Sequence, residues 1–588
     1  MFRKIIFIFV ALFITISLQA KEKYAMGLFH YNLQYVAGDY RIESRIIRES
    51  LYPALQWFER HPEYKSDFEI QGYAIEVLAE DHPEVFKLFK KLVDRGQIEL
   101  VIAHYSDQFF IAYPALDLRK SIEISDEILK KYDLKRSRVF FAQELQWSPA
   151  LAWALQGKYD VVVTSSDPHA YYRGYTLPLV HSNYDGKTIL AFIGAGEKKL
   201  KNVEWTWAFL DDGEVFNTLD YNSDFYRVPE QEKKNKEHYK KLYDEGYKIV
   251  TISEFVDVLK RDKDYKISDY PFVPEGTWNM SVCGPFMWMG RQRSGVERDG
   301  QTRAVSYKLR GNILLAEKLI DQAEKGGKDV TLLRKLLREA WIHLLLSEVS
   351  DSSGWTPWLV EVQYTDNEAA SAMQKLKKIF KVLADDLNLD DEEWLVNTNT
   401  GLIKKVDDIV VDKKDVLLPL NPAVRAASYT IDAKKIGDDL YRIDISCTRP
   451  QDGAVEIVFE TADKGLFYSA GCGEEAMAAI PLDLKHDPAF SLSNGFIYLG
   501  NGYNLIKDCS VEHIAATWKQ KNKKLVFRQE LNENNPGMKM RFYILKGRPR
   551  AGLELANRLN TWPSYMVKKE EGKLKFEKVL PEANVKFD

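Results

Sequence analysis

Cysteine is scarce in this sequence, and the few cysteines lack the spacing of a metal site. The 588 residues include only Cys283, Cys447, Cys472 and Cys509. No two of them are spaced as Cys-x-x-Cys, so a zinc ribbon and thioredoxin-like chemistry are both unsupported. An exported protein could join two of the last three cysteines in a disulfide, and the sequence does not say which two.

The chain also has no block of positive charge and no internal apolar run that could span a bilayer. Lys and Arg total 82 against 86 Asp and Glu, a formal net charge of −4. Nucleic acids and anionic membranes are therefore disfavoured as partners. After residue 20 no stretch supplies the roughly 20 apolar residues that a membrane span needs, so we expect no membrane partner for the mature protein.

One apolar run does occur, at the N-terminus. Arg3 and Lys4 precede the run Ile5–Leu18, and Ala20 is followed by charged residues. A cationic start, a short apolar stretch and a small residue before the cut site are typical of a secretory signal peptide. A retained anchor is the weaker alternative, because the run is shorter than a bilayer span. We expect residues 1–20 to be removed and the product to be periplasmic or secreted.

Three sequence patterns divide the rest of the chain. Short apolar segments alternate with amphipathic stretches up to about Arg261, which predicts parallel β-α units. With seven or eight such strands, a barrel is favoured over an open sheet. We expect an α/β protein with a (β/α) barrel catalytic domain over residues 21–300. A helical domain over residues 301–400 should complete the cleft, because Leu, Ile and Ala recur there at helical spacing. Short segments punctuated by Gly, Asn, Asp and Pro predict a β-sandwich-like domain over residues 401–588.

We expect the strands of the barrel at Tyr24–Phe29, Phe68–Gln71, Ile98–Ala103, Val139–Ala142, Asp160–Thr164, Thr188–Ile193, Trp205–Leu210 and Lys248–Ile252.

Polar side chains follow the carboxyl ends of several of these strands. In chain order they include His30, His104, Asp107, Glu144, Asp211, Asp212 and Glu214. Strand ends of a β/α barrel converge on one face, and that face holds the active site. We therefore expect these side chains to share a cleft.

Carboxylates on separate strands favour one reaction type. Two carboxyl groups on opposite sides of a glycosidic bond are the minimal machinery for its cleavage. The rival is a metal site, which needs clustered His and carboxylate ligands. Asn32 stands where a His30-x-ligand pair would need a ligand, and no two histidines have suitable local spacing. Glycosidic-bond cleavage is therefore the favoured interpretation, and because this chemistry needs neither a metal nor an organic cofactor, we expect none.

Two motifs carry a family resemblance. Residues 139–151 read VFFAQELQWSPAL, and residues 209–216 read FLDDGEVF. Together with collinear matches at Gly96–Leu100, Pro114 and Val273–Trp278, they resemble glycoside hydrolase family 57, the retaining enzymes of α-glucans. The resemblance extends to Ser350-Asp351 with Trp355 and is weak beyond about Leu387. It implies a (β/α)₇ barrel followed by helices and a β-sandwich, in an α-amylase-like or 4-α-glucanotransferase-like enzyme.

The resemblance also assigns residue roles. It makes Glu144 the nucleophile and Asp212 the acid/base, with Asp211 as the rival for that second role. Asp-Asp-Gly is also ordinary turn chemistry, so Asp212 could instead be a turn residue. The remaining candidates for substrate binding are His30, Asp107, Trp147, Asp211, Glu214, Trp278 and Asp351. For His30 and both tryptophans the alternative role is core packing. Asp107 could instead be an ordinary acid in a loop, and Asp351 could cap a helix.

The sequence departs from the family pattern at three places. Asn32 stands where a second His is expected, Asp107 where a Glu is usual, and Asn217 where a Gly normally follows. Asn32 and Asp107 motivate a second hypothesis, a glycan-binding protein without turnover on the same fold. A third hypothesis is a metal-dependent deacetylase or α-mannosidase-like enzyme on a related barrel.

Overall fold

The computed structural model describes most of the chain after residue 20. The described residues are 21–164, 166–218, 225–281, 284–292, 295–354, 356–387, 393–401, 403–405, 408–409, 413–414, 418–449, 453–462, 465–471, 476–580 and 585–586. The expected signal peptide, Cys283, Trp355 and Cys472 lie outside them. Cys447 and Cys509 are buried free thiols, so these two do not form a disulfide with each other.

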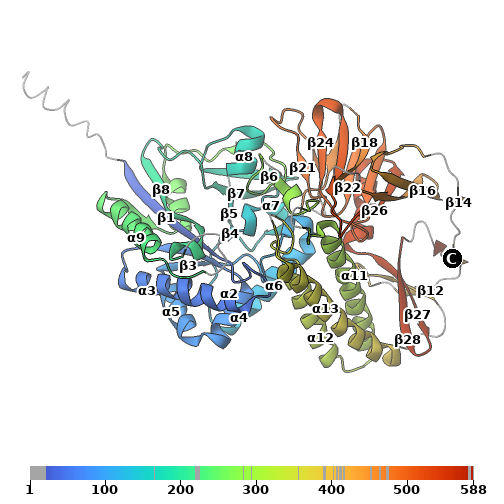
Figure 1. Cartoon of the computed structure of the whole chain (residues 1–588), viewed down its shortest axis with the longest axis horizontal. Helices are drawn as coiled ribbons and strands as arrows, with labels where there is room; N and C mark the ends of the chain where they lie inside the picture. Colours follow the sequence, from blue (N-terminus) through green and yellow to red (C-terminus); the bar gives the residue numbers. More distant parts are fainter. Residues whose placement is uncertain are drawn as a thin grey trace, which may run out of the picture.

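The N-terminal part is built on mostly parallel strands in two five-stranded sheets (Figure 1). In the first, β1 pairs with β2, β8 and β9, and β2 pairs with β3, all in parallel. Their bounds are β1 Glu22–Tyr31, β2 Ser66–Ile70, β3 Ile98–Val101, β8 Val203–Asp212 and β9 Lys248–Val250. The second sheet has the order β10-β6-β7-β5-β4. Its bounds are β4 Val139–Phe141, β5 Val161–Thr164, β6 Leu179–Tyr184, β7 Lys187–Ile193 and β10 Asp269–Tyr270.

The two sheets meet at β3 and β4. The Ser137 N–H donates to the Leu100 carbonyl at 2.8 Å there, but no strand ladder joins the sheets within the described part of the chain. The expected α/β barrel-type domain with further domains is confirmed in this coarse form. The strands do not make one continuously hydrogen-bonded cylinder.

Two strands of the second sheet, β6 and the short β10, were not predicted. β6 and β7 form an antiparallel hairpin, with Tyr184 opposite Lys187. Its two-residue turn is Asp185-Gly186, and both residues have positive φ, 44° and 77°. Asp-Gly is a preferred sequence for a tight hairpin of this kind, so the sequence contained a signal that the alternating β-α pattern hid.

Helices cover the outer faces of the sheets, with α3, α5 and α9 beside β1 and β3 in Figure 1. They are α2 Tyr40–Arg45, α3 Tyr52–Arg60, α4 Gly72–Asp81, α5 Pro83–Asp94, α6 Ala115–Lys131, α7 Leu151–Ala154, α8 Ser166–Arg173, α9 Pro229–Asp244 and α10 Ile252–Arg261. A π-helical stretch, Ile46–Leu51, joins α2 to α3. The core beneath them is rich in aromatic pairs, such as Phe29 with Phe68 at 4.7 Å between ring centroids.

Three long helices follow the barrel: α11 Asp299–Lys325, α12 Thr331–Leu346 and α13 Leu359–Asp386. Their apolar faces share a core with the barrel helices. A fully buried ion pair between Arg310 of α11 and Asp117 of α6, 2.6 Å apart, crosses this interface. Among the described residues, no helix has the length and apolar character to cross a membrane.

The C-terminal part contains two antiparallel sheets that share one apolar core. The larger has the order β14-β16-β17-β26-β23-β22-β19-β20 and the smaller β15-β18-β25-β24-β21. The larger comprises β14 Lys413–Lys414, β16 Ser428–Gly437, β17 Leu440–Thr448, β19 Phe467–Tyr468, β20 Ala478–Ala479, β22 Phe496–Gly500, β23 Tyr503–Lys507 and β26 Gly537–Lys546. The smaller comprises β15 Ala423–Arg425, β18 Ala454–Glu460, β21 Ala489–Phe490, β24 Ala516–Lys519 and β25 Lys524–Glu530.

The last long strands of the chain pack against the long helices. β11 Trp394–Asn397, β12 Ile403–Lys405, β27 Ser564–Glu570 and β28 Lys573–Val579 form a separate sheet. Phe576 of β28 packs on Phe380 of α13, with ring centroids 4.7 Å apart. The short helix α14 Pro549–Ala556 precedes β27, and β13 Asp408–Ile409 pairs with β29 Val585–Lys586.

Candidate active site

Glu144 lies in a strained turn directly after β4. It belongs to the 3-10 turn Gln143–Leu145, in which Glu144 and Leu145 have φ values of 57° and 48°. Left-handed conformations at residues other than glycine cost about 1–3 kcal/mol each, and they cluster at functional sites. Such a conformation needs support from its surroundings, and the segment around residue 276 supplies it.

That supporting segment pairs with the turn through its backbone. Trp147 and Gly276 exchange two hydrogen bonds of 2.7 and 3.0 Å. The Trp278 N–H also donates to the carbonyl of Glu144 at 3.2 Å. Backbone hydrogen bonds therefore hold the turn at Glu144 itself and again at Trp147, three residues later.

The Glu144 carboxylate receives hydrogen bonds on both oxygens. The indole N–H of Trp278 donates to Oε2, and the Ser350 hydroxyl donates to Oε1 at 3.1 Å. Burial raises the pKa of Glu144, whereas the bonds from Trp278 and Ser350 and the charge of His30 work in the opposite direction. The carboxylate is thus half-buried and supplied with partners that stabilise its ionised form.

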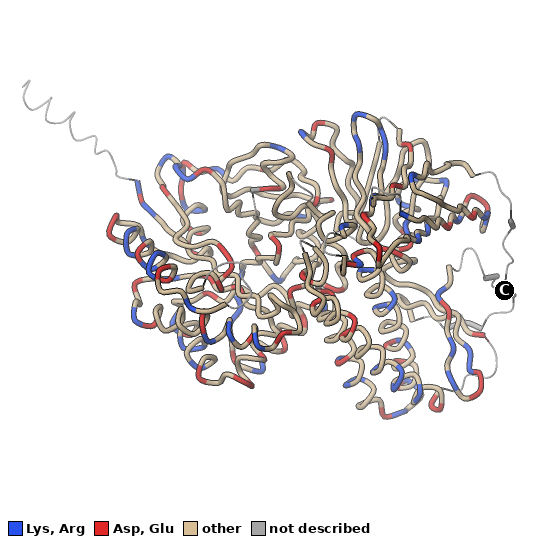
Figure 2. Tube along the Cα trace, viewed as in Figure 1, with Lys and Arg blue, Asp and Glu red and all other residues tan. Residues whose placement is uncertain are grey.

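His30 lies between several acids. It pairs with Asp212 across the β1–β8 ladder, and its Nδ1 contacts the Glu69 carboxylate. Burial lowers the pKa of His30, but the charges of Glu69, Asp212 and Asp107 outweigh it and raise the pKa well above its usual value. The surrounding carboxyl groups therefore favour the protonated form of His30. Asp and Glu residues gather where the barrel, the helices and the sandwich meet (Figure 2).

Asp107 is buried close to His30 and Glu69, with 1% of its surface exposed. Gln71 donates to its Oδ1 at 2.7 Å, and its Oδ2 has no hydrogen-bond partner within the described residues. Burial raises the pKa of Asp107 well above its usual value, against the charge of His30. Its carbonyl accepts the Ser350 N–H at 2.8 Å, so Asp107 also positions a partner of Glu144.

Asn32 connects two further acids. Its amide donates to Oδ2 of Asp351 at 3.0 Å, and its backbone N–H donates to Oε1 of Glu214 at 2.7 Å. Burial raises the pKa of Asp351 well above its usual value, and the charge of Glu144 adds to the shift. Glu214 is fully buried, so its position suits holding the end of β1 rather than touching a substrate.

Asp211 and Asp212 end β8. Asp211 is exposed and Asp212 is half-buried, and Oδ1 of Asp211 accepts the Asp212 N–H at 3.0 Å. Burial raises the pKa of Asp211. The register of the ladder places Asp212, and not Asp211, opposite His30.

The two tryptophans differ in position. Trp147 is 1% exposed, and its indole N–H donates to the Val273 carbonyl at 3.2 Å. A sugar can stack only on a ring with an open face, so the burial of Trp147 favours core packing, the alternative given for it from the sequence. Trp278 is half-buried. Its indole N–H donates to Glu144, a contact that the prediction of a sugar platform did not include.

Several residues of the site were missed from sequence. Gln71 directly follows β2 and Glu69 is the last residue but one of that strand, so attention to the strand end could have found both. Ser350 and Glu275 follow no barrel strand. They lie in two stretches of the family resemblance, Ser350-Asp351 and Val273–Trp278, but were not selected as site residues.

Glu275 joins the site to the sandwich. Its carboxylate accepts hydrogen bonds from the Gly471 N–H, from the Ser491 N–H at 2.7 Å and from the Ser491 hydroxyl. Burial raises the pKa of Glu275 to about 7, against these hydrogen bonds. Since Glu275 precedes Gly276 and Trp278, the sandwich fixes the segment that holds Glu144.

In the part of the chain that the structure describes, no group of three or more His, Cys, Asp or Glu side chains is placed to hold a metal ion. Nδ1 of His30 is already engaged by Glu69.

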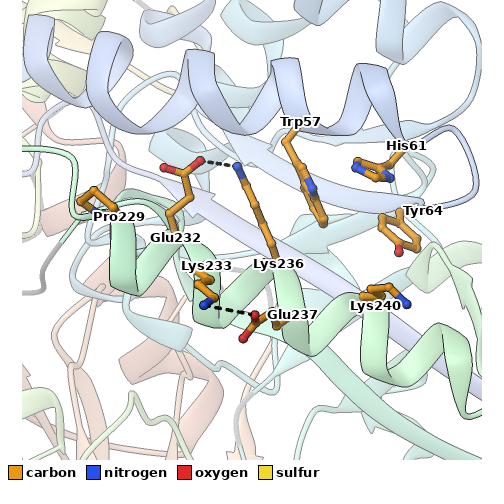
Figure 3. A pocket seen from close by; sticks show the side chains of 9 residues that line it. All are labelled: Trp57, His61, Tyr64, Pro229, Glu232, Lys233, Lys236, Glu237 and Lys240. Atoms are coloured by element: carbon orange, nitrogen blue, oxygen red, sulfur yellow. Dashed lines mark hydrogen bonds and ion pairs between the residues drawn. The ribbon is translucent and has the colours of Figure 1, made fainter.

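A separate groove of about 490 Å³ lies between α3 and α9 (Figure 3). Tyr64 in its wall precedes β2, so the groove is near the opposite ends of the strands from Glu144. It does not belong to this site.

Comparisons with known proteins agree with the motifs. Residues 13–269 match the model for glycosyl hydrolase family 57. An α-amylase from Pyrococcus horikoshii is 30% identical over 115 residues, which are 20% of this chain and 18% of that protein. A 4-α-glucanotransferase from Thermococcus litoralis is 27% identical over 107 residues, 18% of this chain and 16% of that protein. The chain thus spans less than a fifth of these relatives.

One solved structure is similar over nearly the whole chain. An α-mannosidase from Enterococcus faecalis V583 aligns with 94% of this chain and 90% of its own, with a TM-score of 0.61 and 8% identity. That likeness concerns the fold alone. The family resemblance drawn from the motifs is confirmed over residues 13–269, which match glycosyl hydrolase family 57.

Proposed function

We propose that this protein is a retaining glycoside hydrolase or transglycosylase that acts on α-linked glucans. The observation that carries the proposal is the Glu144 carboxylate. It is held in a strained turn at the end of β4 by donors from two distant segments, within the part of the chain that matches the family model.

Glu144 is the proposed nucleophile and Asp212 the proposed acid/base. Glu144 attacks the anomeric carbon while Asp212 donates a proton to the leaving oxygen, and the glycosidic bond breaks. Water or a sugar hydroxyl then attacks the same carbon. Asp212 takes the proton of this second nucleophile, and Glu144 leaves as a carboxylate.

His30 is proposed to assist through its charge. An imidazolium near Glu144 favours the ionised carboxylate that attack requires. We propose Asp107, Asp211, Trp278 and Asp351 as further residues around the bound sugar. The buried Glu214 and Trp147 are proposed to support them without touching it.

The test is product analysis with a defined substrate. Purified protein is incubated with maltooligosaccharides, with and without a chelator, and the anomer released first is read by NMR. Initial release of the α-anomer supports the proposal, and initial release of the β-anomer contradicts retention. Glu144→Gln should abolish turnover under the same conditions.

A second candidate substrate is an α-mannoside, because the sequence analysis left an α-mannosidase-like enzyme open as an alternative. Parallel incubation with α-mannosides distinguishes it, since preferred cleavage of mannosides would replace the glucan assignment. Binding without turnover on every α-linked sugar would favour a glycan-binding protein. Loss of activity with the chelator would favour metal-dependent chemistry.

We also propose that the protein is exported, on the basis of the apolar run in residues 1–20. N-terminal sequencing of protein recovered outside the cytoplasm should begin near Lys21. Recovery of intact protein only in the cytoplasm would contradict export.

A further inference from the structure

A cavity of about 930 Å³ lies between the barrel loops and the smaller sheet of the sandwich. Its volume is at the upper end of the range of small-molecule sites, which often form at domain interfaces. Both domains line it. The barrel side contributes Tyr171, Met280, Ser281 and Phe286.

The floor of the cavity is one face of the sheet. Glu456 of β18 lies opposite Arg528 of β25 and Arg425 of β15. Thr517 and Val526 are likewise cross-strand partners. Because alternate residues of a strand share a face, these side chains point to the same side of the sheet, away from the core that holds Ile457 and Phe527.

The floor carries charges of both signs. Arg425 pairs with Glu456 at 3.0 Å, and Lys519 pairs with Asp487 at 3.5 Å. Paired cations and carboxylates present donors and acceptors together without a strong net field. Such a surface suits hydroxyl groups of a neutral ligand better than a phosphate or sulfate.

Aromatic rings stand over this floor. Tyr171 of α8 stacks on His486, with ring centroids 4.1 Å apart and planes at 17°. Phe286 lies 5.5 Å from the guanidinium of Arg528. Tyr171 and Phe286 are both half-buried, so part of each ring remains available to a ligand.

The cavity adjoins the candidate active site through one short segment. Trp278 donates to Glu144, and Met280 and Ser281, two and three residues later, line the cavity. Asp167 of α8 accepts the Asn279 N–H at 2.6 Å, which ties the helix of Tyr171 to the same segment.

We propose that this cavity is a distal subsite that binds the far end of a neutral oligosaccharide whose reacting end lies at Glu144. This inference rests on the proposed function and deepens it. It predicts a preference for longer chains, because only a long chain can reach both places.

The test is binding as a function of chain length. In a Glu144→Gln background, affinities for maltoheptaose and maltotriose are measured by calorimetry at low and high salt. Tyr171→Ala should weaken maltoheptaose binding about fivefold to tenfold and leave maltotriose binding unchanged. Tyr171→Phe keeps the ring and should match the parent. Tyr429→Ala, a 52% exposed tyrosine on the other sheet, is the matched control.

Equal weakening for both chain lengths, or no change for either, would overturn the distal subsite. Binding of maltoheptaose that collapses at high salt would overturn the assignment of a neutral ligand. Turnover by otherwise wild-type protein is measured separately. An inert enzyme whose heptaose binding depends on Tyr171 would retain the subsite and refute the proposed function.

Discussion

The indole N–H of Trp278 donates a hydrogen bond to Oε2 of Glu144, although 134 residues separate them in the sequence. The same two residues are joined again through their backbones. A carboxylate held in this way has a fixed direction and a stabilised charge, both of which a nucleophile needs.

Replacement of Glu144 tests the proposed nucleophile. Glu144→Ala should lower kcat by about 10⁴-fold or more, because no other group can take over the attack. Binding of an oligosaccharide should change far less, since most of its contacts lie elsewhere. Azide should restore some turnover and give an inverted product. Turnover that survives the substitution would assign the nucleophile to another residue.

Replacement of Trp278 tests the support of that carboxylate. The bond from Trp278 lowers the pKa of Glu144, so Trp278→Phe should raise it. Glu144 must be ionised to attack, and the acidic limb of kcat/KM should therefore move to higher pH. Trp153→Phe is the control, because Trp153 also donates to an oxygen, the carbonyl of Tyr184 at 3.0 Å. An unshifted acidic limb in Trp278→Phe would show that the bond does not tune Glu144.

Glu275 predicts a pH dependence of stability. Burial raises the pKa of Glu275 to about 7 in the folded state, so the folded state binds the proton more tightly than the unfolded state. The free energy of unfolding should therefore fall as pH rises from about 4.5 to about 7, by about 3 kcal/mol from this group. Above that range the contribution should be constant.

Glu275→Gln should remove this slope and also lower kcat, because the segment holding Glu144 is loosened. The measurement is denaturant unfolding at pH 5 and pH 8 for both proteins, with Glu123→Gln on the exposed face of α6 as the control. If the difference between wild type and variant is the same at both pH values, Glu275 does not titrate in this range.

The buried pair of Arg310 and Asp117 predicts a large effect on stability. Arg310→Met leaves the Asp117 carboxylate without its cation in a fully buried place. Loss of one partner of a buried pair costs about 3–5 kcal/mol. Asp117→Asn combined with Arg310→Met should recover part of that loss. Equal unfolding midpoints for wild type and Arg310→Met would mean that the pair contributes nothing to stability.

Much of the barrel-type domain could be predicted from the sequence, because strand period and helix period are local properties. The same locality explains why His30, Asp107, Glu144 and Asp212 could be selected together. They lie at or just after the carboxyl ends of strands, and no knowledge of distant segments is needed to group them.

The missed features depend on contacts between distant segments. Nothing near Glu144 indicates that Ser350 or Trp278 will meet it. Likewise, the sequence around Trp147 does not distinguish a ring in the cleft from a ring in the core. Val273 and His169 approach from other elements and contact Trp147, and these contacts place its ring in the core.

The contacts of Glu275 with Gly471 and Ser491 determine whether the sandwich can be removed or exchanged without harm to the rest of the protein. The sandwich supplies every hydrogen-bond donor that the structure records for this carboxylate, so it is part of the scaffold of the candidate active site. It is not an interchangeable appendage. A chain cut near residue 400, or one recombined with a foreign C-terminal half, would keep its motifs and lose the geometry that makes them useful.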